Sequence, residues 1–193
     1  MVPRLGDRFY EALGYAARLH ASQTRKQKDV PYVGHLLAVT ALVIENGADE
    51  DEAIAALVHD AIEDQGGEET RVEIERRFGA RVAELAVALS DSVVDTRSGA
   101  AKEPWRARKE RHLAKLASAE PSVRLIAACD KLHNLRELVD DCRRLGPEVW
   151  KRFNAGRDEQ IWFYRRVIEV LGSDGSLLAM HLGEALADLE AVA

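Results

Sequence analysis

Four ionisable side chains interrupt an apolar stretch of this chain, DEAIAALVHDAIEDQ, at residues 51–65. They form two pairs, His59-Asp60 and Glu63-Asp64. On a continuous helix of about 3.6 residues per turn, His59 stacks over Glu63 and Asp60 over Asp64. The remainder of that helix is apolar almost all round, which is typical of a buried helix. Because an unpaired imidazole or carboxylate is costly to bury, the pattern predicts a bound cation.

Two other polar residues stand inside apolar helical patterns and can complete a metal site. His35 heads the segment HLLAVTALVIENG, and Asp130 interrupts VRLIAACDKLHNL. The predicted ligands are His35, His59, Asp60 and Asp130. Two imidazoles and two carboxylates suit one divalent manganese, iron or zinc ion per chain, with open positions for water. The absence of a thiolate from this set argues against a structural zinc site.

Glu63 and Asp64 are interpreted as the catalytic pair. A divalent ion polarises a phosphoryl oxygen and lowers the pKa of bound water. Two carboxylates one turn beyond the metal pair can position that water and accept its proton, and their mutual repulsion raises one of their pKa values. We therefore expect hydrolysis of a phosphate linkage, with Glu63 and Asp64 acting without tight metal ligation.

An anionic substrate needs local positive charge in this acidic chain. Arg25, Lys26 and Lys28 lie in a loop just before His35, and guanidinium and ammonium groups bind phosphate. Tyr32 can hydrogen-bond or stack on a base or sugar, and His133 and Asn134 lie one turn beyond Asp130. A second basic cluster is a weaker candidate for the far phosphates: Lys102, Arg106, Arg108, Lys109 and Arg111.

Each of these residues also has a structural interpretation. A single His or Asp in an apolar helix is more often a hydrogen-bonded core residue. Glu63-Asp64 can be a solvated helix end, and Arg25-Lys26 an ordinary charged loop. Three further histidines are interpreted as structural: His20, His112 and His181.

The elements that must position these side chains are all helical. Helical periodicity is predicted over 7–20, 35–46, 51–65, 81–91, 106–116, 121–140, 148–154, 158–172 and 177–192, and no alternating strand pattern occurs. Gly47 and Asp49 are expected as caps, and Thr70 with Glu73 as a capping box that opens a helix ending at Phe78-Gly79. Residues 91–105 lack any period and are expected to form a mobile loop. The predicted fold is an all-α, multi-helix bundle.

Composition excludes several classes of protein. The chain has 193 residues, 47% hydrophobic and 31% charged, which indicates one domain over 1–193. The net charge of −6 argues against a nucleic acid partner. Two cysteines, no signal peptide pattern and no apolar run of about 20 residues predict a cytoplasmic protein without a membrane partner. The oligomeric state is left open.

Three extended motifs, in this order, resemble one family. HASQTRKQKDVPYVGH, LVHDAIED and ACDKLHNLRE are similar to the HD superfamily of metal-dependent phosphohydrolases. More narrowly, they resemble the hydrolase domain of RelA/SpoT alarmone enzymes and the single-domain small alarmone hydrolases. The likeness covers about residues 9–140, and helices at about 147–193 follow it.

The resemblance implies a manganese-dependent HD-domain enzyme that removes the 3′-pyrophosphate from guanosine tetraphosphate or pentaphosphate. It favours Arg25, Lys26, Glu63, Asp64 and Asn134 as functional residues. It also implies a stand-alone hydrolase without a synthetase domain. Alternative substrates are adenosine alarmones, the 2′-phosphate of NADPH, nucleoside monophosphates and cyclic nucleotides. A non-catalytic nucleotide sensor is a further alternative, which the intact Glu63-Asp64 pair argues against.

Overall fold

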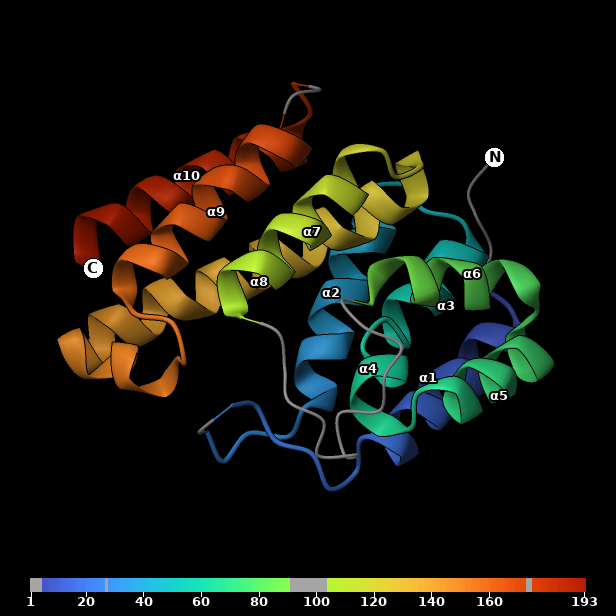
Figure 1. Cartoon of the computed structure of the whole chain (residues 1–193). Coiled ribbons are helices and arrows are strands. Elements are labelled where there is room, and N and C mark those ends of the chain that lie inside the picture. Colours follow the sequence, from blue (N-terminus) through green and yellow to red (C-terminus); the bar gives the residue numbers. More distant parts are fainter. Residues whose placement is uncertain (1–4, 27, 91–103, 173–174) are drawn as a thin grey trace. The chain divides into compact units, whose positions relative to one another are not determined.

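The predicted all-α fold is confirmed in a computed structural model, which describes residues 5–26, 28–90, 104–172 and 175–193 (Figure 1). These residues contain no strand, and Thr24 and Pro31 form an isolated antiparallel bridge. The elements are α1 (Asp7–Leu19), α2 (Val33–Glu45), α3 (Glu50–Leu57), α4 (Ala61–Gln65), α5 (Glu68–Phe78), α6 (Ala80–Leu89), α7 (Trp105–Ala117), α8 (Pro121–Leu145), the 3-10 helix η2 (Gly146–Arg152), α9 (Arg157–Leu171) and α10 (Leu177–Val192).

The contacts of the chain divide it into two compact units. The first unit comprises Met1–Ala101 and Pro121–Ile126, and the second comprises Lys102–Glu120 and Ala127–Ala193. Helix α8 is therefore common to both units, because its first six residues belong to the first. The interpretation of residues 1–193 as a single HD hydrolase domain stays a prediction.

Helix α3 is the centre of the first unit. It packs against α1, α2 and α6, and every residue from Ala53 to Val58 is fully buried. Its start is fixed by a capping box in which the Asp49 carboxylate accepts from the backbone N–H of Glu52 at 2.9 Å. The Glu52 carboxylate accepts from the backbone N–H of Asp49 at 2.8 Å. The predicted caps at Asp49 and at Gly47, whose φ is +85°, are confirmed.

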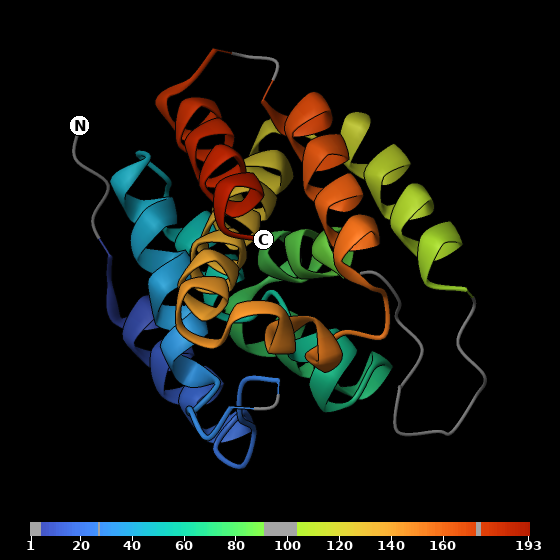
Figure 2. The ribbon, with the colours of Figure 1, turned by 90° about the vertical axis from the view of Figure 1, so that its left-hand side faces the viewer.

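In the second unit, α9 lies between α7 and α10 (Figure 2). The guanidinium of Arg106 on α7 lies over the Trp162 ring at 3.2 Å and pairs with Glu159 at 2.9 Å. Asp141 on α8 is 6% exposed and pairs with Arg144 and Arg152, so its charge is compensated within this unit.

Two local predictions are wrong. Helix α5 begins at Glu68, so Thr70 lies inside it and no side chain caps its start. Gly66 and Gly67, with φ of +153° and +58°, redirect the chain before Thr70 and set the earlier start. The predicted helix at 148–154 is a 3-10 helix at Gly146–Arg152. A loop is expected at 91–105. Its residues 91–103 lie outside the described part of the chain, and α7 begins at Trp105. No described helix is both long enough and apolar enough to cross a membrane.

Candidate metal and catalytic site

A break in the central helix creates the site. The continuous helix predicted over 51–65 is wrong, since α3 ends at Leu57, residues 58–60 form a turn, and α4 begins at Ala61. The backbone N–H of Ala61 bonds to the carbonyl of Val58 at 3.0 Å, which is a tighter turn than an α-helix makes. His59 and Asp60 therefore stand on a turn between the buried end of α3 and the buried start of α4.

The side chain of His59 stabilises this break. Its Nδ1 lies 2.8 Å from the carbonyl oxygen of Ala56, an atom that would accept from the backbone N–H of residue 60 in an unbroken helix. Because a carbonyl only accepts, Nδ1 carries a proton, which leaves Nε2 as the nitrogen that can offer a lone pair to a metal. The fold thus sets the tautomer in which Nε2 can bind a metal.

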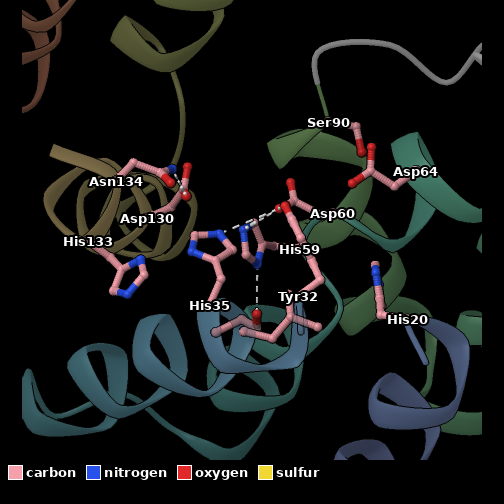
Figure 3. A network of polar contacts seen from close by, with 12 residues as sticks. His20, Tyr32, His35, His59, Asp60, Asp64, Ser90, Asp130, His133 and Asn134 are labelled. Carbon is pink, nitrogen blue, oxygen red and sulfur yellow. Dashed lines mark hydrogen bonds and ion pairs between the residues drawn. The ribbon is translucent and has the colours of Figure 1, made fainter. Parts of the chain in front are cut away.

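Three ligand atoms converge beside the break (Figure 3). Oδ2 of Asp60 lies 3.0 Å from Nε2 of His59 and 3.6 Å from Nε2 of His35. The ligand atoms of the two histidines lie within 4.8 Å of each other. An imidazole lone pair directed at a carboxylate oxygen is stabilised by a shared proton or by a cation, and nitrogen and oxygen donors together suit a borderline divalent ion. The arrangement fits the predicted metal chemistry.

His35 is positioned by the buried face of α2. It is 2% exposed, in the first turn of the helix, and its ring meets that of His59 edge to face at a centroid distance of 5.2 Å. Leu36, Val39 and Val43 form a fully buried apolar stripe behind it. The packing of α2 against α3 therefore fixes both imidazoles relative to each other.

Tyr32 supports Asp60 from the loop that precedes α2. Its hydroxyl donates to Oδ2 of Asp60 at 2.5 Å, and its ring stacks on His20 at a centroid distance of 5.3 Å. Burial and the neighbouring carboxylate of Asp60 raise the pKa of Tyr32, so the hydroxyl keeps its proton and acts as a donor. The predicted contact of Tyr32 with a base or sugar stays a prediction.

Substitution of Tyr32 by Phe is expected to weaken divalent metal binding by about 10-fold to 100-fold, since outer partners of metal ligands contribute that much to affinity. The ring and its stacking remain, and only the donor to Asp60 is lost. Titration of metal-free protein with Mn²⁺, followed by calorimetry, measures the effect. Tyr10→Phe, at a side chain that is 62% exposed on α1, is the matched control. Equal Kd values for Tyr32→Phe and wild type would remove Tyr32 from this role.

The loop that carries the predicted phosphate-binding residues is tied at its ends. The backbone N–H of Tyr32 donates to the Gln23 carbonyl at 2.9 Å, and that of Arg25 to the Val30 carbonyl at 2.9 Å. The Arg25 guanidinium lies 5.5 Å from the centre of the Tyr32 ring, while Lys26 is exposed. Arg25 is thereby placed beside Tyr32, and its contact with phosphate stays a prediction.

Asp64 belongs to the same network on the first turn of α4. Its Oδ2 accepts from Nε2 of Gln23 at 2.8 Å. Burial and then the nearby charge of Asp60 raise the pKa of Asp64, while the hydrogen bond from Gln23 opposes that rise. A carboxylate whose pKa is raised is a better proton acceptor, which suits the predicted catalytic role.

Substitution of Asp64 by Asn is expected to stabilise the metal-free protein at neutral pH. Because the pKa of Asp64 is higher in the folded than in the unfolded chain, the folded state binds its proton more tightly, and stability falls as pH rises between the two values. Asparagine removes that cost and can still accept from Gln23. We expect Tm at pH 7 to rise by about 2 °C or more, an increment on the order of 1 kcal/mol, and the gain to vanish at low pH. A lower Tm at pH 7 would contradict this account.

The second unit holds Asp130 in its own set of contacts on α8. Asp130 is 6% exposed, and its carboxylate accepts from Nδ2 of Asn134 at 2.5 Å and from Nζ of Lys131 at 2.6 Å. Asn134, predicted to bind substrate, is thus a direct partner of Asp130 one turn away. Lys131 was missed by the sequence interpretation. Its position next to Asp130 was the available signal.

Two side chains of the second basic cluster contact other residues of the second unit. Arg106 is held by Glu159 and Trp162, and Nζ of Lys109 lies 5.1 Å from the Phe163 ring centre. Lys102 lies outside the described residues. The proposed contact of this cluster with far phosphates stays a prediction.

Comparisons with known proteins agree on one family. Residues 12–161 match the family model described as HD domain. The chain is 33% identical over 143 residues to human guanosine-3′,5′-bis(diphosphate) 3′-pyrophosphohydrolase MESH1, covering 72% of each chain. It is 30% identical over 181 residues to the Xenopus tropicalis protein of the same name, covering 92% of each. A solved structure described as "A metazoan ortholog of SpoT hydrolyzes ppGpp and plays a role in starvation responses" matches with a TM-score of 0.76 and 28% identity, over 94% of this chain and 95% of that one.

Proposed function

Because the chain belongs to the HD domain family, we propose that it is a metal-dependent hydrolase that removes the 3′-pyrophosphate from guanosine tetraphosphate or pentaphosphate. The products are pyrophosphate and GDP or GTP. The observation that carries the proposal is the convergence of two histidine Nε2 atoms on one oxygen of Asp60, with a second half-buried carboxylate at Asp64 in the same network. The relatives named for this reaction supply the substrate class.

The HD domain implies a divalent metal, and we propose Mn²⁺ held by His35, His59, Asp60 and Asp130. When bound, such an ion polarises a phosphoryl oxygen and makes water more acidic. The mixed nitrogen and oxygen donors, without a thiolate, support manganese over a structural zinc.

The assignment of Asp130 rests on the family's motif order and on α8, where Asp130 stands about one turn after Ile126 of the first unit. Asp130→Asn is expected to lower bound Mn²⁺ from about one ion per chain to well below that, because a neutral amide is a weaker ligand than a carboxylate. Plasma emission spectroscopy of dialysed protein gives the stoichiometry. A full ion per chain in this variant would exclude Asp130 from the ligand set.

The remaining roles belong to side chains outside the proposed ligand set. We propose that Glu63 and Asp64 orient the attacking water and take up its proton, and that Arg25 and Lys26 bind the phosphates. Tyr32 and Asn134 complete the substrate site. The attacking oxygen forms a bond to the 3′-linked phosphorus, the bond from that phosphorus to the ribose 3′-oxygen breaks, and the 3′-oxygen recovers a proton.

An assay of purified protein with Mn²⁺ tests the proposal directly. The substrates are guanosine tetraphosphate and pentaphosphate, an adenosine alarmone, NADPH and a nucleoside monophosphate. We expect pyrophosphate from the guanosine alarmones and loss of the reaction in excess EDTA. Phosphate from NADPH, without turnover of the alarmones, would reassign the substrate. Tight binding of one nucleotide without turnover of any would favour a sensor.

We further propose a cytoplasmic enzyme without a nucleic acid or membrane partner. Two buried free thiols, Cys129 and Cys142, support a reducing compartment. The net charge of −6 opposes binding to a polyanion.

A further inference from the structure

A chain of side-chain hydrogen bonds ends on Asp64, and its centre is Gln23. Nε2 of Gln23 donates to Oδ2 of Asp64 at 2.8 Å. On the other side, Oε1 of Gln23 lies 2.6 Å from Nδ1 of His20 and 2.5 Å from Nε2 of Gln65. His20, labelled in Figure 3, is the C-cap residue of α1. It is 2% exposed. All four residues belong to the first unit.

The donors and acceptors of this chain determine one another. An ionised Asp64 only accepts, so Gln23 turns its NH₂ group toward Asp64 and its oxygen toward His20 and Gln65. Nδ1 of His20 must then carry a proton. Burial lowers the pKa of His20, so the ring is neutral and Nε2 is unprotonated. If Asp64 is protonated instead, it donates to the Gln23 oxygen, and the Gln23 amide nitrogen faces His20. The proton of His20 then lies on Nε2.

The same segment holds both carboxylates of the site. Gln23 donates to Asp64, and the hydroxyl of Tyr32 donates to Asp60. The backbone bond from Tyr32 to Gln23 fixes the spacing of these two donors, and the ring of His20 stacks on that of Tyr32 with an interplanar angle of 17°. The arrangement ties the orientation of Asp64 to that of Asp60.

We propose that Gln23 and His20 are positioning residues for Asp64. His20 holds the Gln23 oxygen, Gln23 holds Oδ2 of Asp64, and Oδ1 is thereby directed to receive the proton of the attacking water. This inference rests on the proposed role of Asp64. It gives a function to His20, which the sequence interpretation treated as structural.

Kinetics of Gln23→Met test the Gln23 step. Methionine has a similar length but cannot donate to Asp64. We expect kcat on guanosine tetraphosphate to fall by about 10-fold to 100-fold, as for other misplaced catalytic groups, with KM within about 2-fold and Mn²⁺ content unchanged. A kcat within 2-fold of wild type would overturn the proposal.

Two substitutions of His20 separate positioning from packing. The side-chain amide nitrogen of Asn can occupy the place of Nδ1, so His20→Asn keeps the donor to Gln23, whereas His20→Leu removes it. Both lose the ring that stacks on Tyr32. We expect His20→Asn to retain kcat within about 5-fold and His20→Leu to lose it as Gln23→Met does. Equal loss in both variants would show that His20 only fills space.

The tautomer of His20 is a readout that does not need the reaction. Long-range ¹H–¹⁵N correlation NMR of the metal-free wild-type protein distinguishes a proton on Nδ1 from one on Nε2. We expect Nδ1–H in the wild type, and a changed population in Gln23→Met. Nε2–H in the wild type would overturn the inferred polarity. If the wild-type protein hydrolyses no alarmone, the proposed function is refuted. The NMR experiment still tests the hydrogen-bond chain independently of that result.

Discussion

His59→Asn should abolish metal binding and reduce turnover by at least about 1000-fold. The side-chain amide of Asn can replace Nδ1 as the donor to the Ala56 carbonyl, so the break between α3 and α4 keeps its hydrogen bond. What the variant lacks is Nε2, the atom that lies 3.0 Å from Oδ2 of Asp60. Loss of a direct ligand should exceed the roughly 10-fold to 100-fold effect of losing an outer partner.

Metal content and stability must be measured together for this variant. Plasma emission spectroscopy should find almost no Mn²⁺ after dialysis, while the Tm of the metal-free variant stays near that of metal-free wild type. His181→Asn on α10, outside the predicted set, should keep both metal and activity. A His59→Asn protein that retains one ion per chain would show that the ion lies elsewhere. His59→Ala is a less clear test, because it also leaves the Ala56 carbonyl without its donor, at a cost of about 1–3 kcal/mol.

The break at His59 shows why the site was only partly predictable from sequence. The residues on both sides of it, Val58, Ala61 and Ile62, are apolar and fully buried, so hydrophobic periodicity continues across the break. The turn depends on the hydrogen bond from the His59 ring to the Ala56 carbonyl. It also depends on the hydrogen bond that the Tyr32 hydroxyl donates to Asp60, 28 residues further along the chain. Local pattern therefore singled out His59 and Asp60 as candidate ligands without the backbone that presents them.

Features fixed by short-range chemistry were predicted correctly. The cap at Asp49 and the left-handed Gly47 each depend on neighbours within a few residues. The capping box expected at Thr70 was wrong because two glycines upstream had already set the helix start. A local motif predicts well only where no stronger local signal competes with it.

The role of Gln23 shows the opposite limit. Gln23 follows His20 by three residues, which is visible in the sequence. The sequence does not show which of the two side chains donates the hydrogen bond between them. That direction is set by the charge on Asp64, which is 41 residues away. His20 was therefore grouped with structural histidines, and only the assembled network indicates that its proton matters.

Glu63→Gln should nearly abolish turnover while leaving the metal in place. Glutamine keeps the size of the side chain but cannot accept a proton from water, and general base catalysis contributes roughly 100-fold to 10,000-fold. Because Glu63 is outside the predicted ligand set, Mn²⁺ should remain at one ion per chain, and KM should change little. Glu69→Gln, an exposed position on α5, is the matched control and should behave as wild type. Parallel loss of metal and activity in Glu63→Gln would instead make Glu63 a ligand, and the proton would then have to pass to Asp64, whose raised pKa already suits it to that task.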